Sequence, residues 1–144
     1  VERGTRLLRL HTDRRSTKAA EIVAEPRVEL HLYDAKAKIQ LRVRGAATLH
    51  ADDAAADAAW GATGAGSRVC YRGPSPGARL DAPQEGDPPE TARNPVDPEW
   101  GRNAFATIHV SAARLEWLYL AARGHRRAVF SWSGDGWEGR WLAP

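Results

Sequence analysis

The fold is decided by the stretch LHTDRRSTKAAEIVAEPRVELHLYD, residues 10–34. Apolar and polar residues alternate across the start of this stretch, and this period of two predicts a strand over residues 6–12. Ser16 then begins a short helix over residues 17–24, because a serine hydroxyl can cap the first N–H groups of a helix. The alternation returns over residues 27–33, where a second strand is expected.

The rest of the chain adds strands and few helices. Further strands are expected over residues 39–49, 104–110, 115–120, 126–132 and 137–142, and helices over residues 51–60 and 67–72. Gly45 inside the first of these strands predicts a bulge or bend, and Ser133–Gly136 is typical of a hairpin turn. Because the strands follow one another directly, the order predicts a mainly β fold with flanking α-helices, a small antiparallel barrel.

The composition limits the class of protein. The chain has 144 residues, a formal net charge of +3, one Cys and no Met. This length suits a single domain, residues 1–144, in which residues 73–103 form a long loop that is functional or disordered. No apolar run reaches the roughly 18 residues of a membrane-spanning helix. The missing Met indicates that an N-terminal piece has been lost or is not shown.

Cysteine and charge restrict the function further. One cysteine, Cys70, excludes an internal disulfide framework and fits a reducing compartment such as the cytoplasm. The charge is too small and scattered to indicate nucleic-acid binding by itself. The five histidines show no metal-ligand spacing, so no metal site is expected. The chain also contains no GxSxG, GxGxxG or Walker motif.

The helix start in the deciding stretch has the ingredients of a phosphate site. Ser16 and Thr17 supply hydroxyls, and Arg14, Arg15 and Lys18 supply positive charge beside free helical N–H groups. A capped helix with solvated basic residues explains the same residues and is the more common arrangement on sequence alone. Both interpretations stay open at this point.

Two further features could bind an aromatic anion. Gln40 lies on the polar face of its strand, where its amide could both donate to and accept from the edge of a ring. Residues 114–120 are aromatic and residues 123–127 are basic, a combination that could stack on and hold an anionic ring. A surface glutamine, and a core strand followed by a solvated turn, are the structural alternatives.

Taken in order, these segments resemble the pyridoxamine 5′-phosphate oxidase family of FMN-binding split barrels. Residues 10–34 are similar to the family's strand, Ser-x-Lys helix start, helix and second strand, and IQLRVRGAATLH (39–50) is similar to its next strand. YRGPSPGA (71–78) is similar to the loop that contacts substrate in true oxidases. RLEWLYL, HRRAVF and WLAP, all within residues 114–144, resemble its C-terminal block.

The resemblance implies an antiparallel six-stranded split β-barrel of the Greek-key type, with short helices and with its N-terminal hairpin missing from this chain. It also implies bound FMN, a homodimer with the flavin at the subunit interface, and a small-molecule substrate, without a nucleic-acid or membrane partner. The implied cofactor-binding residues are His11, Thr12, Arg15, Ser16, Thr17, Lys18, Gln40, Trp117 and Arg127. The implied substrate-binding residues are Arg72, Ser75 and His125.

The resemblance assigns these residues different roles. His11 and Thr12 would lie along the flavin or its ribityl chain, the helix start would hold the phosphate, and Gln40 would reach the ring edge. Trp117 and Arg127 would come from the partner chain. In the family, the Arg that contacts the flavin directly precedes a Phe. This chain departs from that pattern, since the position is occupied by Val129.

The function expected from the resemblance is that of an FMN-dependent oxidoreductase. The substrate loop lacks the oxidase's Arg and Ser pattern, so FMN binding carries over better than pyridoxamine phosphate oxidation. A non-catalytic flavin-binding or sensing protein of the same fold is one alternative. A small nucleic-acid-binding barrel, with arginines on phosphates and tryptophans stacked on bases, is another.

Overall fold

The computed structural model describes residues 5–144, and the contacts among them form two compact units. The first unit contains residues 26–47 and 110–144, together with residues up to 8. The second unit contains residues 9–25 and 48–109. Strands β1, β3 and β4 contribute residues to both units, and each unit is described by itself below.

The described residues form a six-stranded, mainly antiparallel sheet with a few short helices, which confirms the predicted fold class. The strands are β1 (Leu7–Asp13), β2 (Arg27–Asp34), β3 (Ile39–His50), β4 (Phe105–Tyr119), β5 (Arg126–Trp132) and β6 (Trp137–Leu142). The helices are α1 (Thr17–Ala24), α2 (Ala54–Ala62) and α3 (Ala65–Arg68). The order in the sheet is β2-β3-β4-β5-β6, with β1 paired to β4. Among the described residues, no helix is long and apolar enough to cross a membrane.

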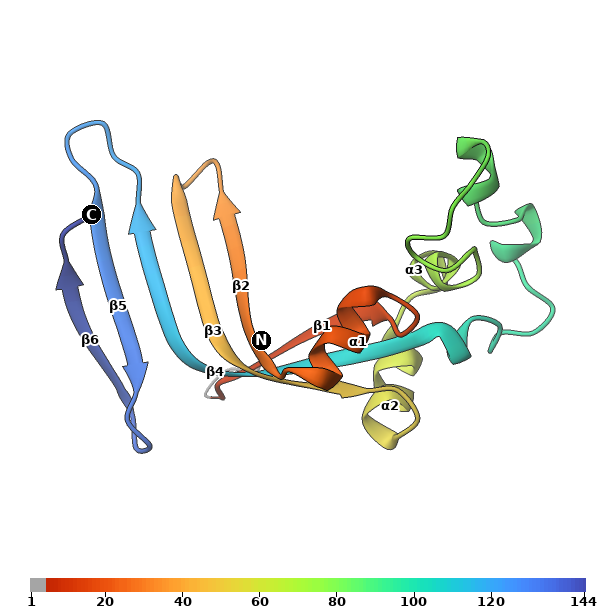
Figure 1. Ribbon diagram of the computed structural model, residues 1–144, viewed down its shortest axis with the longest axis horizontal. Helices are drawn as coiled ribbons and strands as arrows, with labels where there is room; N and C mark the ends of the chain where they lie inside the picture. The colour runs from red at the N-terminus through yellow and green to blue at the C-terminus, as the bar shows by residue number, and fades with distance from the viewer. Residues whose placement is uncertain (1–4) are drawn as a thin grey trace. The chain divides into compact units, whose positions relative to one another are not determined.

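In the first unit, the β2–β3 hairpin and the β5–β6 hairpin lie on either side of β4 (Figure 1). Because side chains alternate along a strand, the register divides them between two faces. The apolar face carries Leu30, Leu32, Leu41, Val43, Leu115, Trp117, Ala128, Phe130 and Trp141. Seven of these nine residues line a cavity of about 400 Å³. The charged face carries Glu29, Arg42, Arg44, Arg114, Glu116 and Arg127.

Strand β4 is longer than the sequence predicts. Two strands are expected there, over residues 104–110 and 115–120, but β4 runs without a break from Phe105 to Tyr119. The intervening small residues interrupt the apolar pattern without interrupting the backbone pairing, since the Ala112 N–H donates to the Arg6 carbonyl at 2.9 Å. The prediction of a break is therefore wrong.

Gly45 lies where β3 passes very close to β4. A Cβ at this position would lie 2.2 Å from the carbonyl oxygen of Ser111 and 3.1 Å from the Cα of Ala112. Only a residue without a side chain fits such an approach, because the neighbouring atoms belong to the backbone.

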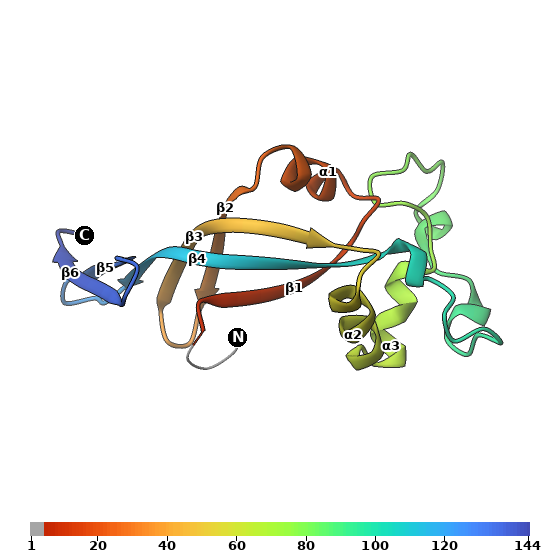
Figure 2. The ribbon, with the colours of Figure 1, turned by 90° about the horizontal axis from the view of Figure 1, so that it is seen from below.

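The core of the second unit is an aromatic cluster beside paired strands β1 and β4, which Figure 2 shows running next to each other. The ring of Phe105, which is fully buried, lies 5.3 Å from Trp60 and 5.1 Å from Tyr71 between centroids. The contact with Tyr71 is edge-to-face and the contact with Trp60 is tilted, and such aromatic pairs add to the stabilisation that the buried area provides. Helix α2 supplies Trp60 and therefore closes this core.

The long loop is tied down at its start by Arg72. This side chain is buried, and its Nε donates to the Trp100 carbonyl at 2.8 Å while its Nη1 donates to the Ala92 carbonyl. The loop contains short 3₁₀ turns at Pro83–Gly86 and Glu90–Ala92. The buried guanidinium of Arg72 thus links the start of the loop to Ala92 and Trp100 in its later part.

Helix α2 begins three residues later than the sequence predicts, because Asp53 caps it. The Asp53 carboxylate accepts a hydrogen bond from the Ala56 N–H at 2.9 Å and lies 2.6 Å from Nδ1 of His50. The Ala56 hydrogen bond, and then the His50 contact, lower the pKa of Asp53 below its ordinary value.

We expect the contribution of Asp53 to stability to depend on pH. A carboxyl whose pKa is lowered by folding stabilises the fold above its unfolded pKa of about 4, and this is lost as the pH falls through the lowered folded value. The Asp53→Asn variant should therefore melt below the wild type at pH 7, and the difference should shrink as the pH falls below about 4. Thermal unfolding followed by circular dichroism measures both, and a constant difference would contradict the assignment.

Candidate functional site

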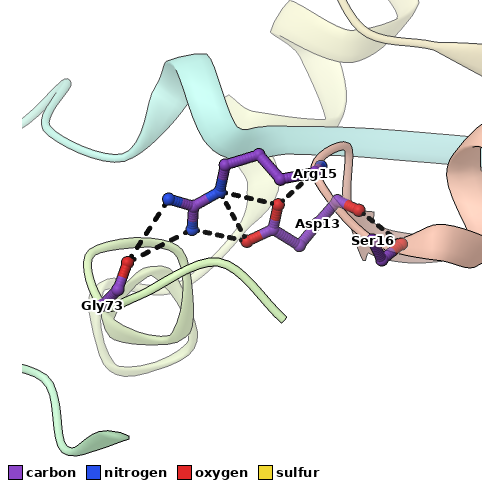
Figure 3. Close-up of polar contacts among 4 residues, drawn as sticks. All are labelled: Asp13, Arg15, Ser16 and Gly73. Atoms are coloured by element: carbon purple, nitrogen blue, oxygen red, sulfur yellow. Dashed lines mark hydrogen bonds and ion pairs between the residues drawn. The ribbon is translucent and has the colours of Figure 1, made fainter. Parts of the chain in front are cut away.

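The chain reverses direction between β1 and α1, and this reversal builds the start of the helix (Figure 3). Ser16 is the N-cap: its Oγ accepts from the Ala19 N–H at 3.4 Å and donates to the Asp13 carbonyl at 2.7 Å. The backbone N–H of Ser16 also donates to that carbonyl, at 3.1 Å. The predicted helix 17–24 and its capping serine are both observed, so the local sequence determines this turn.

Arg15 is held by Asp13. Its Nε donates to Asp13 Oδ1 at 3.0 Å and its Nη2 to Oδ2 at 2.7 Å, while both Nη atoms reach the Gly73 carbonyl at 3.3 Å (Figure 3). The hydrogen bonds that Arg15 donates to Asp13 raise the pKa of its guanidinium. The pair joins the helix start to the first residue of the long loop, and it occupies most of the donors of Arg15.

Thr17 and Lys18 follow the capping serine in the first turn of α1. Both residues are exposed, and the first turn of α1 contains no acidic residue. The first N–H groups of a helix have no acceptor within the helix and carry the positive end of its dipole. This end of α1 can therefore bind an anion through Thr17, Lys18 and backbone N–H groups.

His11 and Thr12 precede this turn on β1 and differ in access. Thr12 is buried, whereas His11 is exposed and packs edge-on against Phe105, with centroids 5.0 Å apart. The Nδ1 atom of His11 lies 3.4 Å from the Thr63 hydroxyl. Of the two, only His11 has an exposed side chain that a ligand could reach.

The register of the first unit separates Trp117 from Arg127. Trp117 pairs with Ala128, whereas Arg127 pairs with Leu118, so the two side chains lie on opposite faces of the sheet. Trp117 belongs to the apolar face, where its ring lies 6.3 Å from that of Trp141. Arg127 lies on the charged face together with Gln40, which is two residues before Arg42 on β3.

The charged face is held together by two carboxylates. Glu116 lies 3.0 Å from Arg127 Nη2, 3.7 Å from Arg42 Nη1 and 3.9 Å from Arg114 Nη2. Glu29 accepts from Arg44 and lies 4.0 Å from Arg42. The hydrogen bond from Arg44 is the main reason that the pKa of Glu29 is lowered. Four guanidinium groups thus surround two carboxylates, which leaves this face with an excess of positive charge.

The residues expected at the substrate are divided between the two units. Arg72 uses its guanidinium within the loop, as described above, whereas Ser75 and His125 are exposed. Arg72 and Ser75 belong to the second unit and His125 to the first. Within residues 5–144, no group of three or more His, Cys, Asp and Glu side chains is arranged to hold a metal ion.

Two contacts were not expected from the sequence. The pairs are Asp13 with Arg15 and Glu116 with Arg127, and in each the carboxylate fixes an arginine that is expected to bind the cofactor. The acid two residues before Arg15 could have indicated the first pair. The second pair depends on the register of β4 and β5, which no local pattern reveals.

Comparisons with known proteins agree with this fold. Residues 1–51 match the family model described as "Pyridoxamine 5'-phosphate oxidase, FMN-binding domain". No curated protein sequence matches the chain. A pyridoxamine 5′-phosphate oxidase-related, FMN-binding protein from Nostoc punctiforme PCC 73102 is 24% identical with a TM-score of 0.81, over 100% of this chain and 76% of that one.

A second solved structure has the same fold. PhzG from Burkholderia lata 383, in complex with tetrahydrophenazine-1-carboxylic acid, is 16% identical with a TM-score of 0.71, over 94% of this chain and 68% of that one. The predicted resemblance and the split-barrel fold are confirmed by these matches. At such identities the solved structures establish the fold, and the family match covers the part of the chain that contains β1, α1, β2 and β3.

Proposed function

We propose that this split-barrel chain, whose first 51 residues match an FMN-binding domain, binds FMN and acts as a homodimeric oxidoreductase. The homodimer, with flavin at the subunit interface, rests on the family resemblance. We propose the cytoplasm as its location because its single cysteine, Cys70, is a free thiol. The substrate that we propose is a small anionic molecule, for reasons given below.

The start of α1 is the observation that carries this proposal. It combines exposed Thr17 and Lys18, unpaired helical N–H groups and a first turn without acids, and this donor set fits a phosphate monoester. Ser16 caps the helix and keeps the N–H groups in place. Arg15 stays paired with Asp13, so a direct contact of Arg15 with the phosphate would require its guanidinium to leave that carboxylate.

For the ring edge, the family resemblance points to Gln40. Gln40 offers both a donor and an acceptor, which suits the alternating heteroatoms of the flavin pyrimidine edge. In the homodimer that we propose, Arg127 would come from the second copy of the chain, and its guanidinium offers positive charge to the ring. When bound, FMN supplies hydride chemistry, and the protein's part is to bind, orient and exclude water.

The charge on this face also supports an anionic substrate. Arg42, Arg44, Arg114 and Arg127 outnumber Glu29 and Glu116, and guanidinium groups bind carboxylates and phosphates through paired N–H donors. PhzG was solved with a carboxylic acid bound. A carboxylate or phosphate on the substrate is therefore the feature that this protein would recognise.

The decisive experiment is a titration of the purified protein with FMN. We expect flavin fluorescence to be quenched and its visible absorption bands to shift, because the ring enters a protein environment. Riboflavin is the matched control: it has the same ring without the phosphate, so it should bind at least tenfold more weakly, as charge-assisted hydrogen bonds are worth about 1.5–3 kcal/mol. Absence of any FMN binding would reject the proposal.

A non-catalytic flavin-binding role is the second candidate. The observation that favours it is Arg72, whose guanidinium is buried and used to hold the loop instead of facing a substrate. A protein of this kind would bind FMN but would not reoxidise or reduce it in the presence of small amines or quinones. Substrate-dependent turnover of the bound flavin would show that the protein is an oxidoreductase and would reject the non-catalytic role.

A further inference from the structure

Glu116 is the centre of the charged face. Its side chain is 12% exposed, and guanidinium groups from three strand positions approach it: Arg42 on β3, Arg114 on β4 itself, and Arg127 on β5. The shortest of these contacts, 3.0 Å, is to Arg127. A carboxylate so little exposed keeps its charge only when positive groups compensate for the lost solvation.

One carboxylate cannot satisfy three guanidinium groups. Each guanidinium has five N–H donors, whereas a carboxylate offers about four acceptor positions. The Nε of Arg127 is buried without a hydrogen-bond partner among the described residues. Glu116 therefore fixes where Arg127 lies without using all of its donors. The side chain of Arg127 is still 32% exposed, and this exposed part is available to a second anion or to a carbonyl oxygen.

Arg127 needs such support because of where it lies. It follows the hairpin between β4 and β5 closely, near the exposed residues Gly124 and His125. A long side chain at such a position loses conformational entropy when it is held in one place. The ion pair with Glu116 provides that restraint before any ligand arrives, which lowers the entropic cost of binding.

We propose that Glu116 is a positioning residue, which holds Arg127 on the charged face so that its guanidinium contacts the edge of the flavin ring. This inference rests on the proposed function, because it concerns the same cofactor. Glu116 itself does not contact the flavin. It acts through Arg127, and Arg42 shares its carboxylate.

The direction of the effect separates positioning from simple electrostatics. FMN is an anion, so removing the negative charge of Glu116 should strengthen FMN binding if only long-range charge matters. If Glu116 positions Arg127, the Glu116→Gln variant should instead bind FMN more weakly, by about tenfold, the size expected when coupled side chains lose their partner. The absorption bands of the bound flavin should also move, because the charge at its ring edge is no longer fixed.

The test compares FMN dissociation constants and bound-flavin spectra of four proteins with the wild type. The variants are Glu116→Gln, Glu116→Asp, Arg127→Ala and the double variant Glu116→Gln/Arg127→Ala. The matched control is Glu138→Gln, which removes the same charge from an exposed position on β6. We expect Glu116→Asp to restore part of the affinity, and Glu138→Gln to behave as the wild type.

The double variant supplies the critical result. If Glu116 acts through Arg127, the Glu116→Gln change costs nothing further once Arg127 is already alanine. Equal or tighter FMN binding by Glu116→Gln, or the same tenfold loss in the Arg127→Ala background, overturns the inference while leaving the proposed function intact. A wild-type protein that does not bind FMN rejects the proposed function itself. Unfolding temperatures of all variants show whether a loss of binding is a loss of fold.

Discussion

The Lys18→Ala variant is expected to bind FMN about thirtyfold more weakly than the wild type, a loss of about 2 kcal/mol, because a charge-assisted hydrogen bond to the phosphate disappears. Lys18 is exposed at the first turn of α1, and that turn has no acidic residue to compete for its ammonium group. The fold should be unaffected, since the ammonium group makes no hydrogen bond or ion pair with residues 5–144. Fluorescence titration with FMN measures the affinity.

Two controls make this result specific. Lys36→Ala removes the same charge from the exposed turn between β2 and β3, and it should leave FMN affinity unchanged. Riboflavin, which has no phosphate, should bind wild type and Lys18→Ala equally well. A Lys18→Ala protein that loses riboflavin and FMN in the same proportion would contradict a role for Lys18 at the phosphate.

The Gly45→Ala variant is expected to be destabilised by about 3 kcal/mol, the upper range for a side chain forced into a packed site. The added Cβ would lie 2.2 Å from the carbonyl oxygen of Ser111, so the backbones of β3 and β4 must separate. In a domain of this size the loss corresponds to a melting temperature lower by roughly 10 °C. Thermal unfolding by circular dichroism measures it.

Gly61→Ala is the matched control for this second prediction. Gly61 lies in α2, and a Cβ there would meet no atom within 4 Å. The same substitution should leave the melting temperature unchanged or raise it, because alanine favours helix by up to about 1 kcal/mol over glycine. Equal melting temperatures for Gly45→Ala and wild type would show that the two strands can move apart at little cost.

Elements with local signals could be predicted from the sequence. The bounds of α1 were predicted correctly because Ser16 and Pro26 mark its ends, and the β5–β6 hairpin because Ser133–Gly136 forms its turn. The start of α2 was misplaced, since two adjacent aspartates compete as caps and Asp53 is the one that is used. The break predicted within β4 was wrong because small residues hide a strand whose pairing is long-range.

The candidate site was predictable only in part. Thr17 and Lys18 are adjacent in sequence, so a correctly predicted helix start is enough to place both in the first turn of α1. The pairing of Glu116 with Arg127 depends on the register of two strands, and so does the placing of Trp117 on the opposite face. Sequence reasoning grouped Trp117 with Arg127 because both belong to one C-terminal block, and a shift of one position in a strand reverses the face.

The six tryptophans are divided between the two units. Trp60 and Trp100 belong to the second unit, whereas Trp117, Trp132, Trp137 and Trp141 belong to the first. Intrinsic fluorescence therefore carries two separable optical signals. A protein in which Trp60 and Trp100 are replaced by phenylalanine emits from the first unit alone, so its emission can be followed during denaturation or flavin titration without a label. The distribution of the tryptophans thus allows unfolding or flavin binding to be followed in each unit separately.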